Sequence, residues 1–524
     1  MAKGGMQQRI AQAVEGYDDS SAEPEVWRFA HARRVRVIID GADYFNWIQQ
    51  AMLKARQRIL LIGWDFDTRI HLTRGRRWFE KGTKREYPAR LGSFILWLNR
   101  HRPKLEIRIL KWRYSIFAML SRGWMVADLA RWARHARIDF KFDDQHPLGC
   151  THHQKIVLID DDLAVCGGID MTTRRWDTRE HVEHDKRRLQ PNGQPYGPWH
   201  DITMMMEGEV ASQLELLGRA RWVRAGGRPL SAPKRDPESA WPDGLKPQFE
   251  NVEIGIARTR AAYQGDRKVD EIERLFVKQI ATAKHFIYFE NQYFTSRVIC
   301  EAIAQRLAEP DPPEIIVVHA ASADGWLEAR AMDPARSELM TALQELDAND
   351  RFHSYIPYTG QTPIYVHAKL TIVDDCVLRI GSANLNNRSM GLDSECDVFI
   401  DCARPGNAHA HDAITQLRHS LLAEHLGIFA QDVPVLIDRN GSMAGMIAEI
   451  GDRNRRHLRP YHPQNHGETA TDLALREALD PERPEDLFEL REHKRGLLRP
   501  GSLLARARAR ARARQTRKTL RADE

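Results

Sequence analysis

The chain has 524 residues, which is more than one ordinary hydrophobic core accommodates and indicates two or three domains. Its composition, 42% hydrophobic and 29% charged residues, excludes a chain that is disordered throughout. Its net charge of +6 arises at one end, because residues 491–524 contain 12 Lys and Arg against 3 Asp and Glu, which leaves the rest close to neutral.

The sequence also argues against a membrane-spanning or secreted protein. No apolar run reaches the roughly 18 residues that a membrane-spanning helix needs. Met1–Gly16 is polar and lacks the apolar core of a signal peptide. The 6 cysteines form no CxxC pair, which fits a reducing compartment. We therefore expect a cytoplasmic protein without a transmembrane segment, whose contact with membranes is peripheral.

The first half of the chain reads as helices alternating with strands. A helical pattern at Tyr44–Ala55 leads into an apolar strand at Arg58–Phe66, and a second apolar strand follows at Leu105–Leu110. His153–Asp160 (HQKIVLID) is then a strand that begins with His-x-Lys. Asp201 opens the last strand of this half.

The second half repeats this order after a linker rich in Pro, Gly, Ser and charge at residues 226–249. The counterparts are a helix, two apolar strands, a His-x-Lys strand (HAKLTIVD) and a carboxylate that opens a strand: Val269–Ala283, His285–Phe294, Glu314–His319, His367–Asp374 and Glu395.

This internal repeat predicts an α/β protein built from two similar domains. Strands that alternate with helices form a mixed or parallel sheet covered by helices. Two such copies are expected to face each other across a pseudo-twofold axis, with the active site at their interface. The expected boundaries are an N-terminal segment, a first domain, a linker, a second domain, an extension and a basic tail: 1–39, 40–225, 226–249, 250–430, 431–498 and 499–524.

The two His-x-Lys strands carry the residue types that phosphoryl transfer needs. Residues i and i+2 of a strand point to the same face, so His153 lies beside Lys155 and His367 beside Lys369. Two ammonium groups at one site require an anion, and phosphate is the natural partner. One imidazole can attack phosphorus, while the other protonates the leaving alcohol and then deprotonates an incoming water or alcohol. The lysines neutralise the developing charge, so no metal or other cofactor is required.

Further residues near the two strands are expected to support these four groups. Asp201 and Glu395 are candidates to hold the imidazole tautomers. Six residues separate each His-x-Lys strand from a pair of small residues that ends in Gly168 or Ser382, and these would let the backbone approach the phosphate. Asn384 is a candidate donor to the phosphate oxygens.

The two strands resemble the duplicated HxKxxxxD signature of the phospholipase D superfamily, over roughly residues 40–427. Five segments look like the phosphatidylcholine-hydrolysing phospholipases D in particular: GGIDMTTRRWD at 167–177, PWHD at 198–201, ENQYF at 290–294, GSANLNNRSMGLDSE at 381–395 and LRHSLLAEHLG at 417–427. The resemblance implies a pair of α/β/α sandwiches and a two-step reaction through a phosphohistidine, without an obligatory metal. It also implies a catalytic set of six residues: His153, Lys155, Asp160, His367, Lys369 and Asp374.

Within this set the resemblance makes His153 the nucleophile and His367 the acid and then the base. Asp160 and Asp374 lie on the opposite strand face from the lysines, where we expect them to stabilise the strand end and the turn. Asp170 stands where many family members have Asn, which argues against a donor to phosphate at this position.

The favoured function is hydrolysis or transphosphatidylation of glycerophospholipids at a membrane surface. A phosphatidyltransferase of the cardiolipin synthase type shares the motif, but relatives of that type usually carry N-terminal membrane helices. A phosphodiesterase acting on nucleic acid is favoured only by the basic tail, and the near-neutral body argues against it. The tail alternates Ala and Arg over Ala505–Arg514 and is expected to attract anionic lipid by charge alone.

A histidine segment and three aromatic residues have both a functional and a structural interpretation. His181 lies near carboxylates in Glu180–Asp185 (EHVEHD), but the segment lacks HExxH spacing, so a connecting loop is favoured over a zinc site. Trp64, Trp176 and Tyr293 flank strand ends, where an aromatic wall for a choline-like cation is the alternative to packing at the rim.

Overall fold

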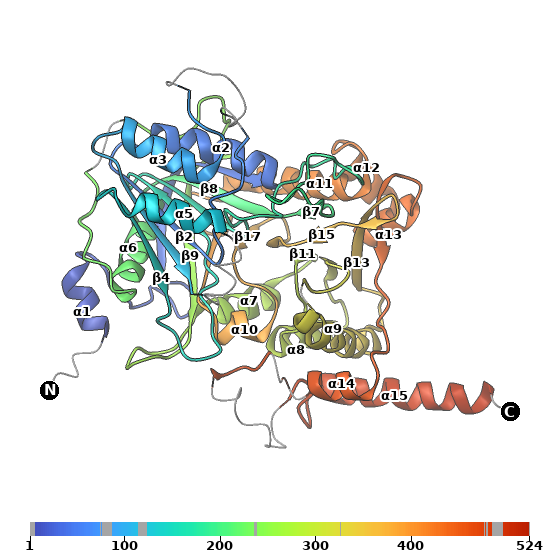
Figure 1. Cartoon of the computed structure of the whole chain (residues 1–524). Coiled ribbons are helices and arrows are strands. Elements are labelled where there is room, and N and C mark those ends of the chain that lie inside the picture. Colours follow the sequence, from blue (N-terminus) through green and yellow to red (C-terminus); the bar gives the residue numbers. More distant parts are fainter. Residues whose placement is uncertain are drawn as a thin grey trace.

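One mixed β-sheet carries both halves of the repeat in the computed structural model of the chain (Figure 1). The structure describes residues 6–73, 75, 86–113, 123–234, 238–324, 326–475, 477, 480–484 and 496–522.

The first half follows a short N-terminal helix, α1 (Met6–Ala13). Its elements, in chain order, are β1 (Arg28–Ile39), α2 (Gly41–Lys54), β2 (Arg58–Gly63), α3 (Leu91–His101), β3 (Glu106–Trp112), α5 (Gly123–Trp132), β4 (Ile138–Asp143), β5 (Ile156–Ile159), β6 (Leu163–Gly167), β7 (Trp199–His200), β8 (Ile202–Gly208) and α6 (Glu209–Arg224).

The second half runs through β9 (Phe249–Arg260), β10 (Val269–Asp270), α7 (Glu271–Thr282), β11 (Phe286–Asn291), α8 (Arg297–Leu307), β12 (Glu314–His319), α9 (Trp326–Leu346), β13 (Phe352–Thr359), β14 (Thr362–Pro363), β15 (Tyr365–Val366), β16 (Lys369–Val373), β17 (Val377–Gly381), α10 (Asn387–Gly391), β18 (Glu395–Asp401), the 3₁₀ turn η1 (Ala408–Ala410) and α11 (His411–Leu426). The C-terminal extension adds α12 (Asp432–Asn440), α13 (Met443–Ile450), β19 (Arg456–Pro460), α14 (Glu468–Leu475) and α15 (Leu503–Ala522).

The two halves have the same strand order. Neighbouring strands run β4-β3-β2-β5-β6-β8-β1 in the first half and β13-β12-β11-β16-β17-β18-β9 in the second. The equivalent strands β1 and β9 pair with each other antiparallel, with Phe29 opposite Gly255. An antiparallel pair of equivalent strands is what a twofold relation between copies produces. The predicted pair of α/β units about a pseudo-twofold axis is therefore confirmed.

Alternate residues of the central strands enter different hydrophobic cores. In β2, Ile59 and Leu61 pack in the core that contains residues of α2 and α3, whereas Leu60 and Ile62 pack in the core that contains α6. This alternation follows from the two-residue period of a strand. Helices therefore cover both faces of the sheet, as in an α/β/α sandwich (Figure 1).

Two expected boundaries are wrong. The first domain begins before residue 40, because β1 is a strand of the sheet and the counterpart of β9. The extension after residue 430 also contributes to the sheet, because β19 pairs antiparallel with β13 and places Tyr355 opposite Pro460. Within the expected linker at 226–249, the described residues 226–234 and 238–248 contain no helix or strand, and β9 begins at Phe249.

The basic tail, which the sequence predicts as a flexible or helical polycation, contains a helix, α15, that packs on the body of the protein. Leu504 and Ala507 of α15 are buried in the core that also contains residues of α8 and α9. Arg508 binds Glu338 of α9, with Nε 2.5 Å from Oε2. Because an α-helix has 3.6 residues per turn, an Ala-Arg alternation still brings small residues to one face at every third or fourth position.

Candidate active site

The seam between the two halves is closed by two reciprocal backbone contacts. In the segment ahead of β5, the N–H of His153 donates to the carbonyl oxygen of Ser394, ahead of β18, at 2.9 Å. The pseudo-symmetric contact joins β7 to β15, which pair in parallel, and the N–H of His367 donates to the carbonyl oxygen of His200 at 2.7 Å. Each motif histidine is therefore fixed by the backbone of the opposite half.

Each imidazole also meets a carboxylate from the opposite half. Nδ1 of His153 lies 3.0 and 3.1 Å from the two carboxylate oxygens of Glu395. Nδ1 of His367 lies 2.7 Å from Oδ2 of Asp201. When Nδ1–H donates to a carboxylate, the lone pair of Nε2 is left for the reacting group. The structure thus brings each of the two suggested carboxylates to a motif imidazole, and each pair is a contact between the two halves.

The two motif lysines are anchored on the backbone beside the imidazoles. Nζ of Lys155 donates to the carbonyl oxygen of His153 at 2.6 Å and lies 3.5 Å from Oδ2 of Asp170. Nζ of Lys369 donates to the carbonyl oxygen of His367 in the same way. An ammonium group has three donors, so each lysine keeps capacity for a phosphate oxygen. The carboxylate of Asp170 forms an ion pair with Lys155, and its other oxygen accepts the backbone N–H of Trp64 at 3.0 Å.

Burial and neighbouring charge set the protonation of these groups. Burial lowers the pKa of His153 well below its ordinary value of 6.5, and Lys155 and Lys369 lower it further. Burial, Lys369 and also the charge of His153 lower the pKa of His367, so the two halves form one electrostatic site. Burial lowers the pKa of Lys369 to about 7, and burial raises the pKa of Glu395 to about 8. An anion between the lysines favours their charged forms, which is the condition a phosphodiester creates.

Gly168 and Ser382 adjoin the two carboxylates, and their expected role in letting the backbone approach a phosphate stays a prediction. A Cβ atom on residue 168 would lie 2.1 Å from Oδ1 of Asp201, so only Gly leaves room for that carboxylate. Oγ of Ser382 donates to Oε2 of Glu395 at 2.5 Å. Asn384 is buried, and its side-chain oxygen has no hydrogen-bond partner among the described residues. Asn384 stays a candidate for a phosphate contact.

Asp160 and Asp374, which the resemblance counts in the catalytic set, hold the motif strands to their neighbours. The carboxylate of Asp160 accepts the backbone N–H groups of residues 56–58 at 2.6, 2.7 and 2.8 Å. The carboxylate of Asp374 does the same for residues 284–286 at 2.7, 2.8 and 2.8 Å. Each aspartate therefore fixes the start of the adjacent strand, β2 or β11, as the strand-face argument anticipated.

We expect Asp374→Ala to lower the free energy of unfolding by about 3 kcal/mol, because three backbone donors lose their acceptor at about 1 kcal/mol each. Per folded molecule, turnover should change little. Chemical denaturation and active-site titration measure the two effects. Asp161→Ala is the control for backbone strain, since Asp161 also has a positive φ of 60°, close to the 52° of Asp374. Equal destabilisation of the two variants would contradict the assigned role.

Three residues beside His367 were missed in the sequence. The ring of Trp199 lies 5.2 Å from that of His367 and stacks on Tyr365 at 4.6 Å. The guanidinium of Arg175 lies over Trp199 at 4.4 Å, and its charge contributes to the lowered pKa of His367. Arg175 is thus a third cation beside the two lysines. Arg175 lies in the segment 167–177, which resembles phospholipases D, but its position in the sequence did not indicate that it would lie beside His367.

The suggested aromatic wall is present only in part. The ring of Trp64 lies 6.2 Å from that of His153 and stacks on Trp112 at 5.8 Å, so it does border the site. Trp176 instead packs against Arg187, whose guanidinium lies 5.0 Å from its ring. The aromatic surfaces next to the imidazoles are therefore those of Trp64 and Trp199.

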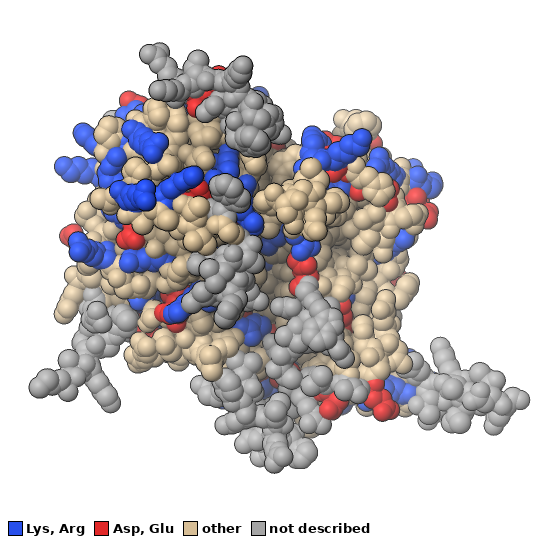
Figure 2. All heavy atoms as spheres, viewed as in Figure 1, with Lys and Arg blue, Asp and Glu red and all other residues tan. Residues whose placement is uncertain are grey.

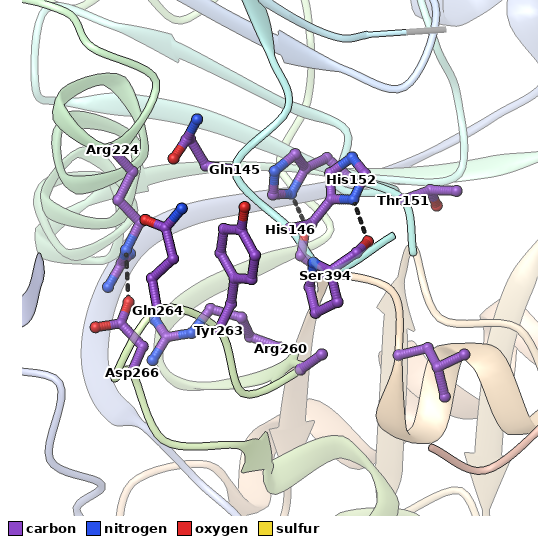
Figure 3. A pocket seen from close by; sticks show the side chains of 13 residues that line it. Gln145, His146, Thr151, His152, Arg224, Arg260, Tyr263, Gln264, Asp266 and Ser394 are labelled. Carbon is purple, nitrogen blue, oxygen red and sulfur yellow. Dashed lines mark hydrogen bonds and ion pairs between the residues drawn. The ribbon is translucent and has the colours of Figure 1, made fainter. Parts of the chain in front are cut away.

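A separate pocket lies against the first seam contact (Figure 3). Its lining includes His152 and Ser394, whose side chains contact each other at 2.7 Å. Successive residues of an extended segment point to opposite sides, so this pocket and the catalytic imidazole occupy different sides of the seam. Arg224 in the same pocket lies 3.3 Å from Asp266, its partner there. Because no catalytic imidazole lines the pocket, we do not assign it to the substrate.

Comparisons with known proteins find similarity to phospholipases D. Residues 327–473, which include the second His-x-Lys strand, match a family described as Phospholipase D. The chain is 26% identical over 499 residues to "Phospholipase D1" of Saccharomyces cerevisiae, covering 75% of this chain and 29% of that protein. It is 27% identical over 397 residues to "Phospholipase D alpha 1" of Zea mays, covering 53% and 49%. The chain thus spans less than half the length of these two relatives.

Among solved structures, the chain is similar to the crystal structure of phosphatidylserine synthase from Haemophilus influenzae Rd KW20. The TM-score is 0.50 at 10% sequence identity, and the match covers 90% of this chain and 97% of the other. At this identity the likeness concerns the fold, and it extends the two-unit α/β architecture over nearly the whole chain.

Proposed function

Because the chain belongs to the phospholipase D superfamily, we propose that it cleaves the phosphodiester bond between the phosphate and the head group of glycerophospholipids. The observation that carries the proposal is the crossed pair of imidazole–carboxylate contacts at the seam, flanked by two lysines. This arrangement suits one phosphodiester anion. Nucleophile, proton carrier and charge neutralisation are all supplied by side chains, so the proposal requires no cofactor for the chemical step.

In the proposed reaction, Nε2 of His153 attacks phosphorus and the bond to the head-group oxygen breaks. Protonated His367 gives its proton to that oxygen, and the phosphatidyl group is left on His153 as a phosphohistidine. His367, now neutral, removes a proton from water or an alcohol, whose oxygen attacks phosphorus and breaks the P–N bond. The negative charge of the bound phosphate favours the protonated form of His367 that the first step needs.

The test is to offer the purified chain vesicles of mixed phospholipids, with and without a primary alcohol, and to identify the products by mass. We expect phosphatidic acid in water and a phosphatidyl alcohol when alcohol is present, both absent with His153→Ala. Conversion of phosphatidylglycerol to cardiolipin without phosphatidic acid would move the function to a phosphatidyltransferase. Cleavage of nucleic acid without any lipid product would overturn the proposal.

We further propose that the enzyme works at a membrane surface as a peripheral protein, and the charge of the first half supports this. Figure 2 shows Lys and Arg side chains gathered over the part of the surface where Figure 1 places α3 and α5. Arg100 lies in the last turn of α3, Lys104 follows this helix, and Arg134 follows α5, and all three are exposed. Of the helices that the structure describes, none is long and apolar enough to cross a bilayer. Peripheral charge attraction is therefore the mode of binding that we propose.

Replacing Arg100, Lys104 and Arg134 together by Gln should weaken binding to anionic vesicles at low salt by roughly 100-fold, at about 1 kcal/mol per basic residue. The difference in vesicle binding between the wild type and the triple variant should shrink as salt rises, because screening weakens the attraction of both to the anionic surface. Vesicle sedimentation at several salt concentrations measures it. Activity on a short-chain soluble phospholipid is the control and should stay unchanged. Unaltered vesicle binding at low salt would contradict a role for this face.

The pH dependence of kcat/KM should be bell-shaped, with both limbs displaced toward acid. Neutral His153 is the attacking form, and because burial lowers its pKa well below 6.5, the acid limb should lie below pH 6.5. The first step also needs protonated His367 and the ammonium form of Lys369. Burial lowers the pKa of His367 well below 6.5 and that of Lys369 to about 7, so kcat/KM should decline as pH rises and should keep declining through about 7. In the kcat profile this alkaline limb should lie higher, since bound phosphate stabilises the ammonium form. Coincident alkaline limbs in the two profiles would contradict the assignment to Lys369.

A further inference from the structure

A second group of ionisable side chains converges in the interior directly behind His367. Its members come from the residue before α2, the segment between β6 and β7, strand β7 and helix α11, and all are buried: Asp40, His181, His200 and Glu424. The first three belong to the first half and Glu424 to the second. His181 lies in the segment that the sequence analysis assigned to a connecting loop.

The four side chains present one ligand atom each around a common point. Nε2 of His181 lies 3.5 Å from Oδ2 of Asp40 and 3.1 Å from Oε1 of Glu424. Nδ1 of His200 lies 3.2 Å from Oδ1 of Asp40 and 3.1 Å from the same Glu424 oxygen. Ligands at about 2.0–2.1 Å from a tetrahedral ion are about 3.3 Å from one another. The two histidine contacts with Oε1 of Glu424, both 3.1 Å, are close to that value, whereas the contacts with Asp40 involve its two different oxygens. One ligand atom from each of the four residues lies within 4.8 Å of the others.

The opposite ring nitrogen of each histidine is held by another buried carboxylate. Nδ1 of His181 lies 3.0 Å from Oδ2 of Asp177, and Nε2 of His200 lies 2.7 Å from Oε2 of Glu290. Metal-binding histidines characteristically donate their second N–H to a carboxylate, which fixes the tautomer and turns the other nitrogen toward the ion. Both histidines of this group therefore have the surroundings of metal ligands.

Two of the inward-facing atoms lack a well-aligned hydrogen bond. Oδ2 of Asp40 and Nδ1 of His200 are buried and have no hydrogen-bond partner within the part of the chain that the structure describes. Each is close to an ionic neighbour, but without the geometry of a hydrogen bond. A cation between them would satisfy both atoms, whereas an isolated buried polar atom costs stability.

We propose that Asp40, His181, His200 and Glu424 bind one divalent transition-metal ion, with zinc as the best match. Two neutral imidazoles and two carboxylates form a tetrahedral N₂O₂ set whose charge balances a dication. The ion would tie the two halves together, because Glu424 comes from the second half. It would also steady the catalytic seam, since the carbonyl oxygen of His200 accepts the N–H of His367 and the next residue, Asp201, holds the imidazole. The ion has no part in the proposed phosphoryl transfer.

The test is elemental analysis of the full chain, purified without chelator from cells grown with zinc. We expect about one equivalent of zinc in the wild type and in His319→Gln, a matched control because His319 is also fully buried but lies outside the group. His181→Gln and Glu424→Gln should each lose the ion and unfold at a lower temperature. Zinc that survives in both variants would sit elsewhere and would overturn the proposal.

A second measurement covers the case in which the variants fail to fold. The chelator-treated wild type is titrated with Co²⁺, and we expect the visible absorption of tetrahedral cobalt to saturate at one equivalent, together with a rise in the unfolding temperature. In the alternative to a metal site, His181 and His200 are both protonated, and each proton takes the place of a bond to the ion. A folded wild type that contains no metal, binds no Co²⁺ and is not stabilised by added Zn²⁺ would establish that arrangement and reject the ion.

Discussion

Replacing either His153 or His367 by Ala should abolish turnover of phospholipid, with losses on the order of 10⁴-fold or more. The two imidazoles act in one covalent cycle, so removal of either should cost about as much as removal of both. Their burial at one seam, and the effect of the His153 charge on His367, place them in the same electrostatic environment. Initial rates on vesicles for the two single variants and the double variant measure the loss and its non-additivity.

The identity of the nucleophile is tested by trapping. His367→Asn keeps a polar side chain but removes the proton carrier, so the phosphatidyl group should leave His153 slowly and labelled phosphate should be recovered on that residue after acid-free quenching. His152→Asn is the matched control, because His152 is adjacent but contacts Ser394 on the other side of the seam. Label on His367 in a His153 variant would reverse the two roles. Absence of any labelled histidine under rapid quench would argue against the covalent step.

The repeat made most of the fold and the centre of the site predictable. His153 with Lys155, and His367 with Lys369, could be paired from the two-residue period of a strand, and the matching position of the two motifs made a surface explanation improbable. Local patterns also located the helices and strands around them to within a few residues. These local patterns could not predict which distant segment each helix or strand packs against.

The errors share this physical cause. Strand β1 reads RFAHARRVRVII and was assigned to the N-terminal segment outside the first domain, although Ala30, Ala32 and Val35 enter a shared core. The packing of α15 was not predicted because an Ala-Arg alternation has no continuous apolar face. In the structure, Leu504 and Ala507 of α15 are buried in the core that contains residues of α9. Each depends on a surface supplied by a distant segment.

The same limit applies to the functional groups. Asp201 and Glu395 were suggested as orienting residues because each opens a strand, but the sequence did not reveal that each serves the histidine of the other half. The group formed by Asp40, His181, His200 and Glu424 is drawn from four separate segments, and its only local signal was a pair of histidines with the wrong spacing. Because each motif imidazole is oriented by a carboxylate of the opposite half, both halves are needed to orient either imidazole.

Glu395→Gln should lower kcat by on the order of 10⁴-fold while leaving substrate binding nearly intact, by analogy with the loss of the orienting carboxylate in a catalytic triad. The hydroxyl groups of Ser382 and Ser389 donate to the two Glu395 oxygens, at 2.5 and 2.7 Å. Above the pKa of about 8 that burial gives Glu395, its carboxylate can accept these bonds and that from Nδ1–H of His153 at once. A Gln amide can instead donate to Nδ1, which moves the proton to Nε2 and removes the lone pair that attacks phosphorus.

Ser389→Ala is the matched control, because it removes one of these hydroxyl donors and keeps the carboxylate, and we expect it to cost no more than about tenfold. Substrate binding is measured with the short-chain lipid under single-turnover conditions, which separate it from the chemical step. The nitrogen chemical shifts of the His153 ring report the tautomer directly and should show Nδ1–H in the wild type and Nε2–H in Glu395→Gln. If kcat of Glu395→Gln stays within tenfold of wild type, or if its ring keeps Nδ1–H, the carboxylate does not set the tautomer of His153, and its part in the seam is limited to holding the two halves together.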